Sequence, residues 1–172
     1  WFSSKFILIN IMNYKDLLKS KKFKIGVWGT GYIGLSTMVY FSKKNIKCVG
    51  YDINKEKVSK INSGIIPLKD LEKWFGFDIK KIVKKGYLKA TTNSDDLISE
   101  KFIAHFIAVP TEKNGKPYYK PLMSVLSNIA KMRNLNSKIP PLIIVESTLA
   151  PKVSDKKILP FLKRKKFQIG KN

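Results

Sequence analysis

Three glycines stand close together at the end of an apolar segment. Gly29, Gly31 and Gly34 form a Gly-x-Gly-x-x-Gly series after residues 24–28, a predicted strand, and Tyr32 and Ile33 begin a predicted helix. In such a series the first glycine permits a tight turn, the second lets a diphosphate approach the backbone, and the third lets helix and strand pack closely. Free N–H groups at the start of the helix then face the diphosphate. The series therefore predicts a dinucleotide site.

A carboxylate follows the next apolar segment. Asp52 ends the predicted strand 47–52 and lies 23 residues after Gly29. A carboxylate at this strand tip accepts hydrogen bonds from the hydroxyls of the adenosine ribose and repels a 2′-phosphate. The glycine series and Asp52 together favour NAD over NADP as the cofactor. The alternative is that Asp52 only caps the helix that follows it.

Three other side chains, Glu146, Cys48 and His105, are of types that can act in catalysis or bind metals. Glu146 ends an apolar strand on the side of the glycine series, where desolvation could raise its pKa towards that of a general base. Its alternative role is a solvent-facing side chain or an acceptor for loop amides. Cys48 falls inside a predicted strand, so we expect an inert, buried thiol. His105 lies in mid-strand without a second ligand nearby in sequence, and we predict a core histidine and no metal site.

The segments that must position these residues alternate between strand and helix. Residues 106–109 and 142–145 are apolar without alternation, which is typical of parallel strands covered on both faces. We predict an α/β fold: a Rossmann-like, doubly wound parallel sheet in three αβα layers. Asn54 and Ser94 are expected to cap helices, and Pro121 and Pro151 suit a first turn. The predicted strands are 24–29, 47–52, 88–91, 102–109 and 142–147, and the predicted helices are 32–44, 55–62, 70–84, 95–98, 121–134 and 152–164.

Composition limits the class of protein. The 172 residues suit one domain, and a single cysteine excludes a disulfide framework and fits a reducing cytoplasm. The net charge is +22, yet Lys supplies 32 of the 34 basic residues and Arg133 and Arg164 the rest. Because groove-reading proteins favour arginine, this charge does not favour nucleic-acid binding as the main function, although it should attract anionic ligands.

The amino end carries no recognisable address. Its longest apolar run is residues 6–9, far short of the roughly 20 residues that a membrane-spanning helix needs, so we expect no membrane partner. We interpret residues 1–22 as an extension and 23–172 as the cofactor domain. Met12 is our hypothesis for the natural start, which would leave residues 1–11 poorly packed.

Several motifs between residues 23 and 170 together resemble the amino-terminal domain of the UDP-glucose/GDP-mannose dehydrogenase family. In order they are the glycine series with Tyr32-Ile33, Gly50-Tyr51-Asp52, Lys57-Val58, Asn62-Ser63-Gly64, Leu88-Lys89-Ala90-Thr91-Thr92, Val109-Pro110-Thr111 and Glu146-Ser147-Thr148. The family oxidises the C6 hydroxyl of a nucleotide-linked sugar to a carboxylate with two molecules of NAD. The resemblance therefore implies a nucleotide-sugar substrate and, for the full-length protein, a homodimer.

The resemblance also implies roles for single residues. Tyr32 and Ile33 would present backbone to the NAD phosphates, and Lys57 would reach the adenosine ribose held by Asp52, or its phosphate. Thr111 and Thr148 would contact the cofactor near its reactive half. The alternative for both threonines is a hydroxyl that satisfies a backbone group at a strand end.

The family's nucleophilic cysteine, with its partner lysine and asparagine, belongs to later segments. We therefore expect a chain truncated before the catalytic half, inactive alone, with 167–169 beginning a sixth strand. Residues 67–71, Glu112 and Lys152 depart from family motifs, so local substrate contacts and an N-acetylated sugar stay open. Two other functions also stay open: a stand-alone dinucleotide-sensing or nucleic-acid-binding module, and a hydroxyacid-type dehydrogenase, against which Thr111 and residues 146–148 speak.

Overall fold

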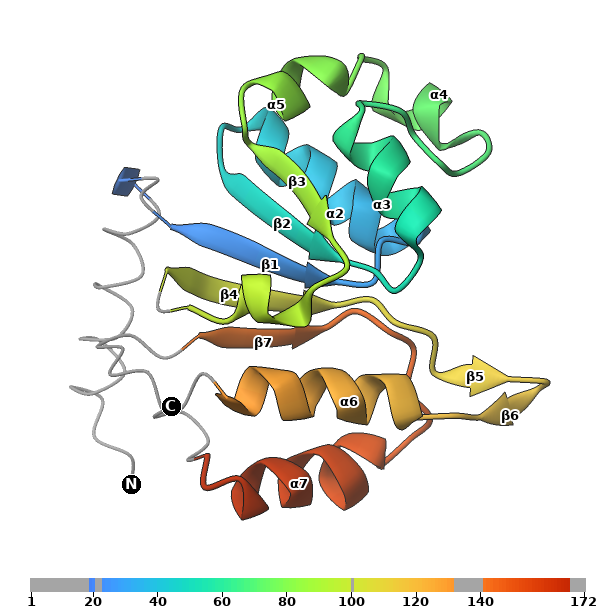
Figure 1. Cartoon of the computed structure of the whole chain (residues 1–172). Coiled ribbons are helices and arrows are strands. Elements are labelled where there is room, and N and C mark those ends of the chain that lie inside the picture. Colours follow the sequence, from blue (N-terminus) through green and yellow to red (C-terminus); the bar gives the residue numbers. More distant parts are fainter. Residues whose placement is uncertain (1–18, 21–22, 100, 132–140, 168–172) are drawn as a thin grey trace.

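Five parallel strands form the centre of the molecule (Figure 1). The computed structural model describes residues 19–20, 23–99, 101–131 and 141–167. The strands pair in parallel in the order β3-β2-β1-β4-β7. Each ends within two residues of its predicted end, so the predicted sheet is confirmed. Their bounds are β1 Lys24–Trp28, β2 Lys47–Tyr51, β3 Leu88–Thr91, β4 Phe102–Ile107 and β7 Leu142–Val145.

Helices cover both faces of this sheet. In Figure 1, α2 to α5 lie on one side, and α6 and α7 lie on the other. This arrangement confirms the Rossmann-like, doubly wound αβα fold. The helices are α2 Tyr32–Lys43, α3 Lys55–Asn62, α4 Leu71–Phe75, α5 Lys80–Lys84, α6 Lys120–Ile129 and α7 Leu159–Arg164.

The first strand shows why its sequence does not alternate between apolar and polar residues. Val27 packs with Leu35 of α2 on one face, whereas its neighbour Trp28 packs with Leu122 and Leu126 of α6 on the other. Successive strand residues point to opposite faces. Because both faces are covered here, both sets of side chains must be apolar.

Two predicted helices between β2 and β4 differ from the observed ones. The predicted helix 70–84 is divided into α4 and α5, because Gly76 at the end of α4 takes a left-handed conformation (φ 62°). The predicted helix 95–98 is a 3-10 turn, Ser94–Leu97, and its cap is Asn93 rather than Ser94. The cap predicted at Asn54 is confirmed, since its side chain accepts a hydrogen bond from the Lys57 N–H at 3.0 Å.

Differences also occur near α6 and α7. The predicted helix 152–164 begins with a π-helical turn, Ser154–Ile158, before α7. A small antiparallel hairpin, β5 Glu112–Lys113 and β6 Lys116–Pro117, was not expected from the sequence. Its turn residues, Asn114 and Gly115, both have positive φ, and Asn-Gly is the pair that such two-residue turns favour.

Some predictions fall on residues that are not described. The following lie outside the described residues: residues 1–18 and 21–22 of the predicted extension, including Met12; residues 132–134 of the predicted helix 121–134; and residues 168–169 of the predicted sixth strand 167–169. Within the described ranges, no helix has both the length and the apolar character needed to cross a bilayer.

Candidate functional site

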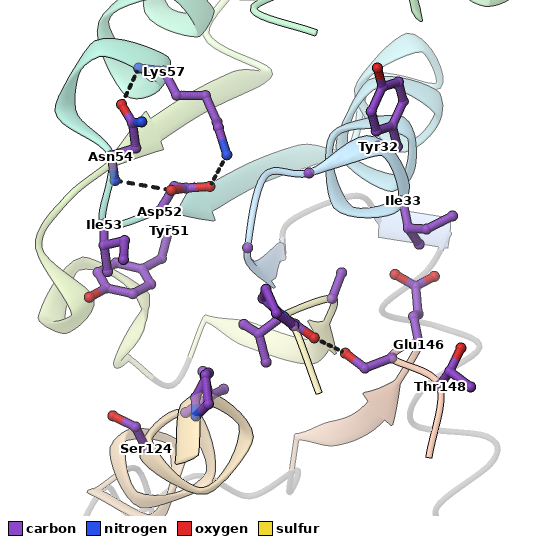
Figure 2. Close-up of a pocket in the computed structure, with 18 of the residues that line it drawn as sticks. Tyr32, Ile33, Tyr51, Asp52, Ile53, Asn54, Lys57, Ser124, Glu146 and Thr148 are labelled. Carbon is purple, nitrogen blue, oxygen red and sulfur yellow. Dashed lines mark hydrogen bonds and ion pairs between the residues drawn. The ribbon is translucent and has the colours of Figure 1, made fainter. Parts of the chain in front are cut away.

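A pocket of about 700 Å³ opens at the carboxyl ends of β1, β2, β4 and β7 (Figure 2). Open α/β sheets bind ligands at this edge, where the strand order reverses. Four groups of residues line it: Gly29, Gly31, Tyr32 and Ile33 from the glycine series; Tyr51–Asn54 and Lys57 after β2; Ala108–Pro110 and Glu146–Thr148 after β4 and β7; and Pro121, Ser124, Val125 and Asn128 from α6.

A different structural feature accounts for each of the three glycines. Gly29 has φ +90°, and a Cβ there would lie 2.5 Å from the Ala108 carbonyl oxygen. A Cβ on Gly34 would overlap the Gly29 carbonyl oxygen, so this glycine lets α2 pack on β1. A Cβ on Gly31 would meet no atom within 4 Å, and Gly31 lines the pocket. The corner therefore leaves open the space that a diphosphate needs, beside the amino end of α2.

Asp52 lies at the tip of β2 with its carboxylate held in place. Its Oδ2 accepts hydrogen bonds from the Thr30 N–H at 3.0 Å, the Thr30 hydroxyl at 2.8 Å and the Lys57 ammonium at 3.0 Å. Its Oδ1 accepts one from the Asn54 N–H at 3.0 Å. Burial acts to raise the pKa of Asp52, but these hydrogen bonds together outweigh it and leave the pKa below its usual value. Asp52 is therefore a fixed, ionised acceptor.

Glu146 lies across the pocket from Asp52 (Figure 2). The Thr37 hydroxyl is 3.1 Å from both of its carboxylate oxygens. Burial raises the pKa of Glu146, and the Thr37 hydrogen bond reduces that rise. A carboxylate with a raised pKa beside a ligand pocket can exchange a proton. This agrees with the predicted role of Glu146 as a general base, which stays a prediction.

The two threonines predicted to contact cofactor lie together at the far side of this edge. The Thr111 hydroxyl donates a hydrogen bond to the Thr148 carbonyl at 2.6 Å. Thr148 lines the pocket, and Thr111 is not among the lining residues. The Thr111 hydroxyl thus satisfies a strand-end carbonyl, the alternative that the sequence left open, while its contact with a cofactor stays a prediction.

The structure confirms that Cys48 and His105 are buried, as predicted. Cys48 is buried, and burial raises the pKa of its thiol to about 12. His105 is buried, its Nδ1 accepts a hydrogen bond from Trp28 Nε1 at 3.0 Å, and burial lowers its pKa to about 4. Among the described residues, no three His, Cys, Asp or Glu side chains gather in a way that could hold a metal ion.

Sequence reasoning missed the contribution of Thr30 and of α6. The β1–β2 pairing sets Trp28 opposite Tyr51, so the segments that follow the two strands lie side by side, and the Thr30 hydroxyl reaches the Asp52 carboxylate. A hydroxyl between the first two glycines was the available signal. The sequence of α6 contains no comparable signal, because only the tertiary fold brings that helix to the pocket.

A family model described as the UDP-glucose/GDP-mannose dehydrogenase family, NAD binding domain, matches residues 23–172. The chain is 34% identical over 135 residues to the UDP-N-acetyl-D-mannosamine dehydrogenase of Pyrococcus horikoshii, covering 77% of this chain and 30% of that protein. It is 34% identical over 130 residues to the UDP-glucose 6-dehydrogenase of Campylobacter jejuni, covering 73% of this chain and 30% of that protein.

A solved structure supports the same assignment. The native UDP-N-acetyl-mannosamine dehydrogenase of Staphylococcus aureus superposes with a TM-score of 0.70 at 31% identity, covering 86% of this chain and 34% of that one. The chain thus spans about 30% of the length of the curated relatives it matches. It belongs to the UDP-glucose/GDP-mannose dehydrogenase family and corresponds to that family's NAD-binding domain.

Proposed function

We propose that the chain is the NAD-binding part of a dehydrogenase that oxidises the C6 hydroxyl of a UDP- or GDP-linked sugar to the uronate. The observation that carries the proposal is the open space at Gly31 next to the fixed carboxylate of Asp52 in one pocket. Relatives named for UDP-N-acetyl-D-mannosamine and for UDP-glucose are both at least 34% identical to this chain, so we propose the class of substrate and not one sugar.

Different residues of the pocket would bind different parts of the cofactor. The amino end of α2, with Gly31, Tyr32 and Ile33, would hold the diphosphate through backbone N–H groups. Asp52 would accept from the adenosine ribose, with Lys57 beside it. When bound, NAD supplies the hydride acceptor of the oxidation.

Glu146 and Thr148 lie at the other end of the pocket, which we assign to the reactive half of the cofactor. Burial raises the pKa of Glu146, so that its carboxylate can take up a proton when the hydroxyl of the substrate is oxidised. The Thr111 hydroxyl holds the Thr148 carbonyl and so positions residue 148. We assign the nucleophilic cysteine and the sugar contacts to the part of the relatives that this chain does not span, and we propose a homodimer for the full-length protein.

Two measurements test the proposal. Calorimetric titration should show NAD binding at a single site, with NADP binding more weakly because its 2′-phosphate meets Asp52. With NAD and UDP-glucose, UDP-N-acetyl-D-mannosamine or GDP-mannose, this chain alone should produce no reduced NAD, whereas the longest reading frame that contains it should turn over at least one of them. A folded chain that binds no NAD would contradict the assignment.

A further inference from the structure

A second pocket, of about 430 Å³, lies where the amino end of α6 meets α7 and the π-helical turn before it. It shares no lining residue with the pocket described above. Pro121, Ser124 and Val125 of α6 line the first pocket, whereas Lys120 and Met123 line this one. Residues one or two positions apart point to different sides of a helix, so α6 separates the two pockets.

Four cations surround this second pocket, which we name the α6–α7 basic pocket. They are Lys120, Lys156, Lys157 and Arg164, and no carboxylate lines it. None of the four takes part in the ion pairs found in the described part of the chain. The contact found for them is a long one between the Lys157 ammonium and the Tyr119 ring, 5.8 Å to its centroid.

Uncompensated like charges around one hollow raise its positive potential, which attracts an anion. The amino end of α6 adds to this potential, and its first residues have no side-chain cap. Arg164 is the one arginine among the described residues. Its planar group can form two parallel hydrogen bonds to a phosphate, whereas a lysine ammonium acts as a point charge.

We propose that the α6–α7 basic pocket binds a small molecule through a diphosphate group. Four cations exceed what one phosphate needs, and two adjoining phosphates would neutralise them more fully. Lys120 of α6 and Lys156 and Lys157 of the π-helical turn are the lysines that line the pocket. The proposal concerns a site separate from the cofactor pocket and does not depend on the bound state of that pocket.

The test is a titration of the isotope-labelled chain with inorganic pyrophosphate, followed by amide NMR. Saturable shifts are expected at the backbone amides of Lys120 and Met123. The double variant K156Q/R164Q should weaken the affinity read at these amides by about tenfold or more, because it removes two charge-assisted contacts. The matched control K81Q/K84Q removes the same charge from exposed positions on α5, across the sheet, and should leave the affinity within about twofold of the unmodified chain.

Two results would overturn the proposal. One is an equal loss in both double variants, which would mean a general attraction of anions to a basic surface. The other is saturable shifts confined to the amides of the glycine corner. All four substituted positions are exposed, so neither variant should lose the fold, and unchanged amide spectra away from each mutation verify this. UDP as a second ligand tests the source of the group: shifts at Lys120 and Met123 that saturate with UDP support recognition of a nucleotide's diphosphate.

Discussion

The carboxylate of Asp52, which we expect to bind the adenosine ribose, already accepts several hydrogen bonds within the chain. An ionised carboxylate offers about four acceptor positions. Among the described residues, three donors converge on Oδ2, while Oδ1 accepts one hydrogen bond, from the Asn54 N–H. Oδ1 is therefore the oxygen left to accept from a ribose hydroxyl. The sequence predicted this carboxylate and its strand tip, but the orienting hydroxyl of Thr30 follows from the β1–β2 register.

Asp52→Asn should weaken NAD binding by roughly tenfold to a hundredfold, the equivalent of about 1.5–3 kcal/mol for hydrogen bonds to a charged group. The difference between NAD and NADP should narrow, because the charge that repels a 2′-phosphate is gone. Calorimetry with both dinucleotides measures this. Asp155→Asn, at an exposed position without an ion pair in the described structure, is the matched control. Equal losses in both variants would count against the ribose role of Asp52.

His105 should make stability depend on pH. Burial lowers its pKa from 6.5 to about 4, so the folded chain keeps it neutral where the unfolded chain takes up a proton. The free energy of unfolding should therefore fall as the pH falls, by about 2 kcal/mol from His105 between about pH 7 and 5. Urea denaturation at both pH values measures the change. His105→Asn keeps an acceptor for Trp28 and should lose this part of the pH dependence; an unaltered dependence would contradict the account.

At the scale of elements, the strand–turn–helix corner of β1 and α2 depends on the distance between helix and strand. Gly34→Ala should lower the free energy of unfolding by about 1–3 kcal/mol, since the added Cβ overlaps the Gly29 carbonyl oxygen and forces α2 away from β1. Gly31→Ala is the control: residue 31 has φ −72° and open space, so the loss of stability should stay below about 1 kcal/mol, the cost of alanine in place of glycine at this N-cap position. Denaturation of both variants by urea tests this; equal stabilities would show that Gly34 does not set the packing.

The elements also show where sequence patterns fail. Strands β1 and β4 were predicted to within two residues because a parallel strand buried on both faces leaves a continuous apolar run. The break between α4 and α5 was missed because the charged and apolar pattern of 70–84 continues through Gly76, and only its left-handed backbone ends the helix. The β5–β6 hairpin could have been predicted from the sequence, since Asn114-Gly115 is a strong turn signal.

At the scale of the whole molecule, the sequence indicated the fold, the glycine corner and the acidic strand tip, because each depends on short local patterns. It did not indicate the α6 wall of the cofactor pocket or the α6–α7 basic pocket. Their side chains come from segments far apart in the chain, 117–123 and 156–164 for the basic pocket, and only tertiary packing brings them together. Glu146 and Thr37 likewise meet across 109 residues.

The most direct test of the central claim, that the β1–α2 corner binds the diphosphate of NAD, is calorimetric titration of the unmodified chain and of Gly31→Ala with NAD. We expect the unmodified chain to bind NAD. We expect the variant, whose fold is retained, to bind it about tenfold or more weakly, because the new Cβ occupies the space of the ligand. Equal affinities for NAD in the two folded proteins, or no binding to either, would contradict this claim.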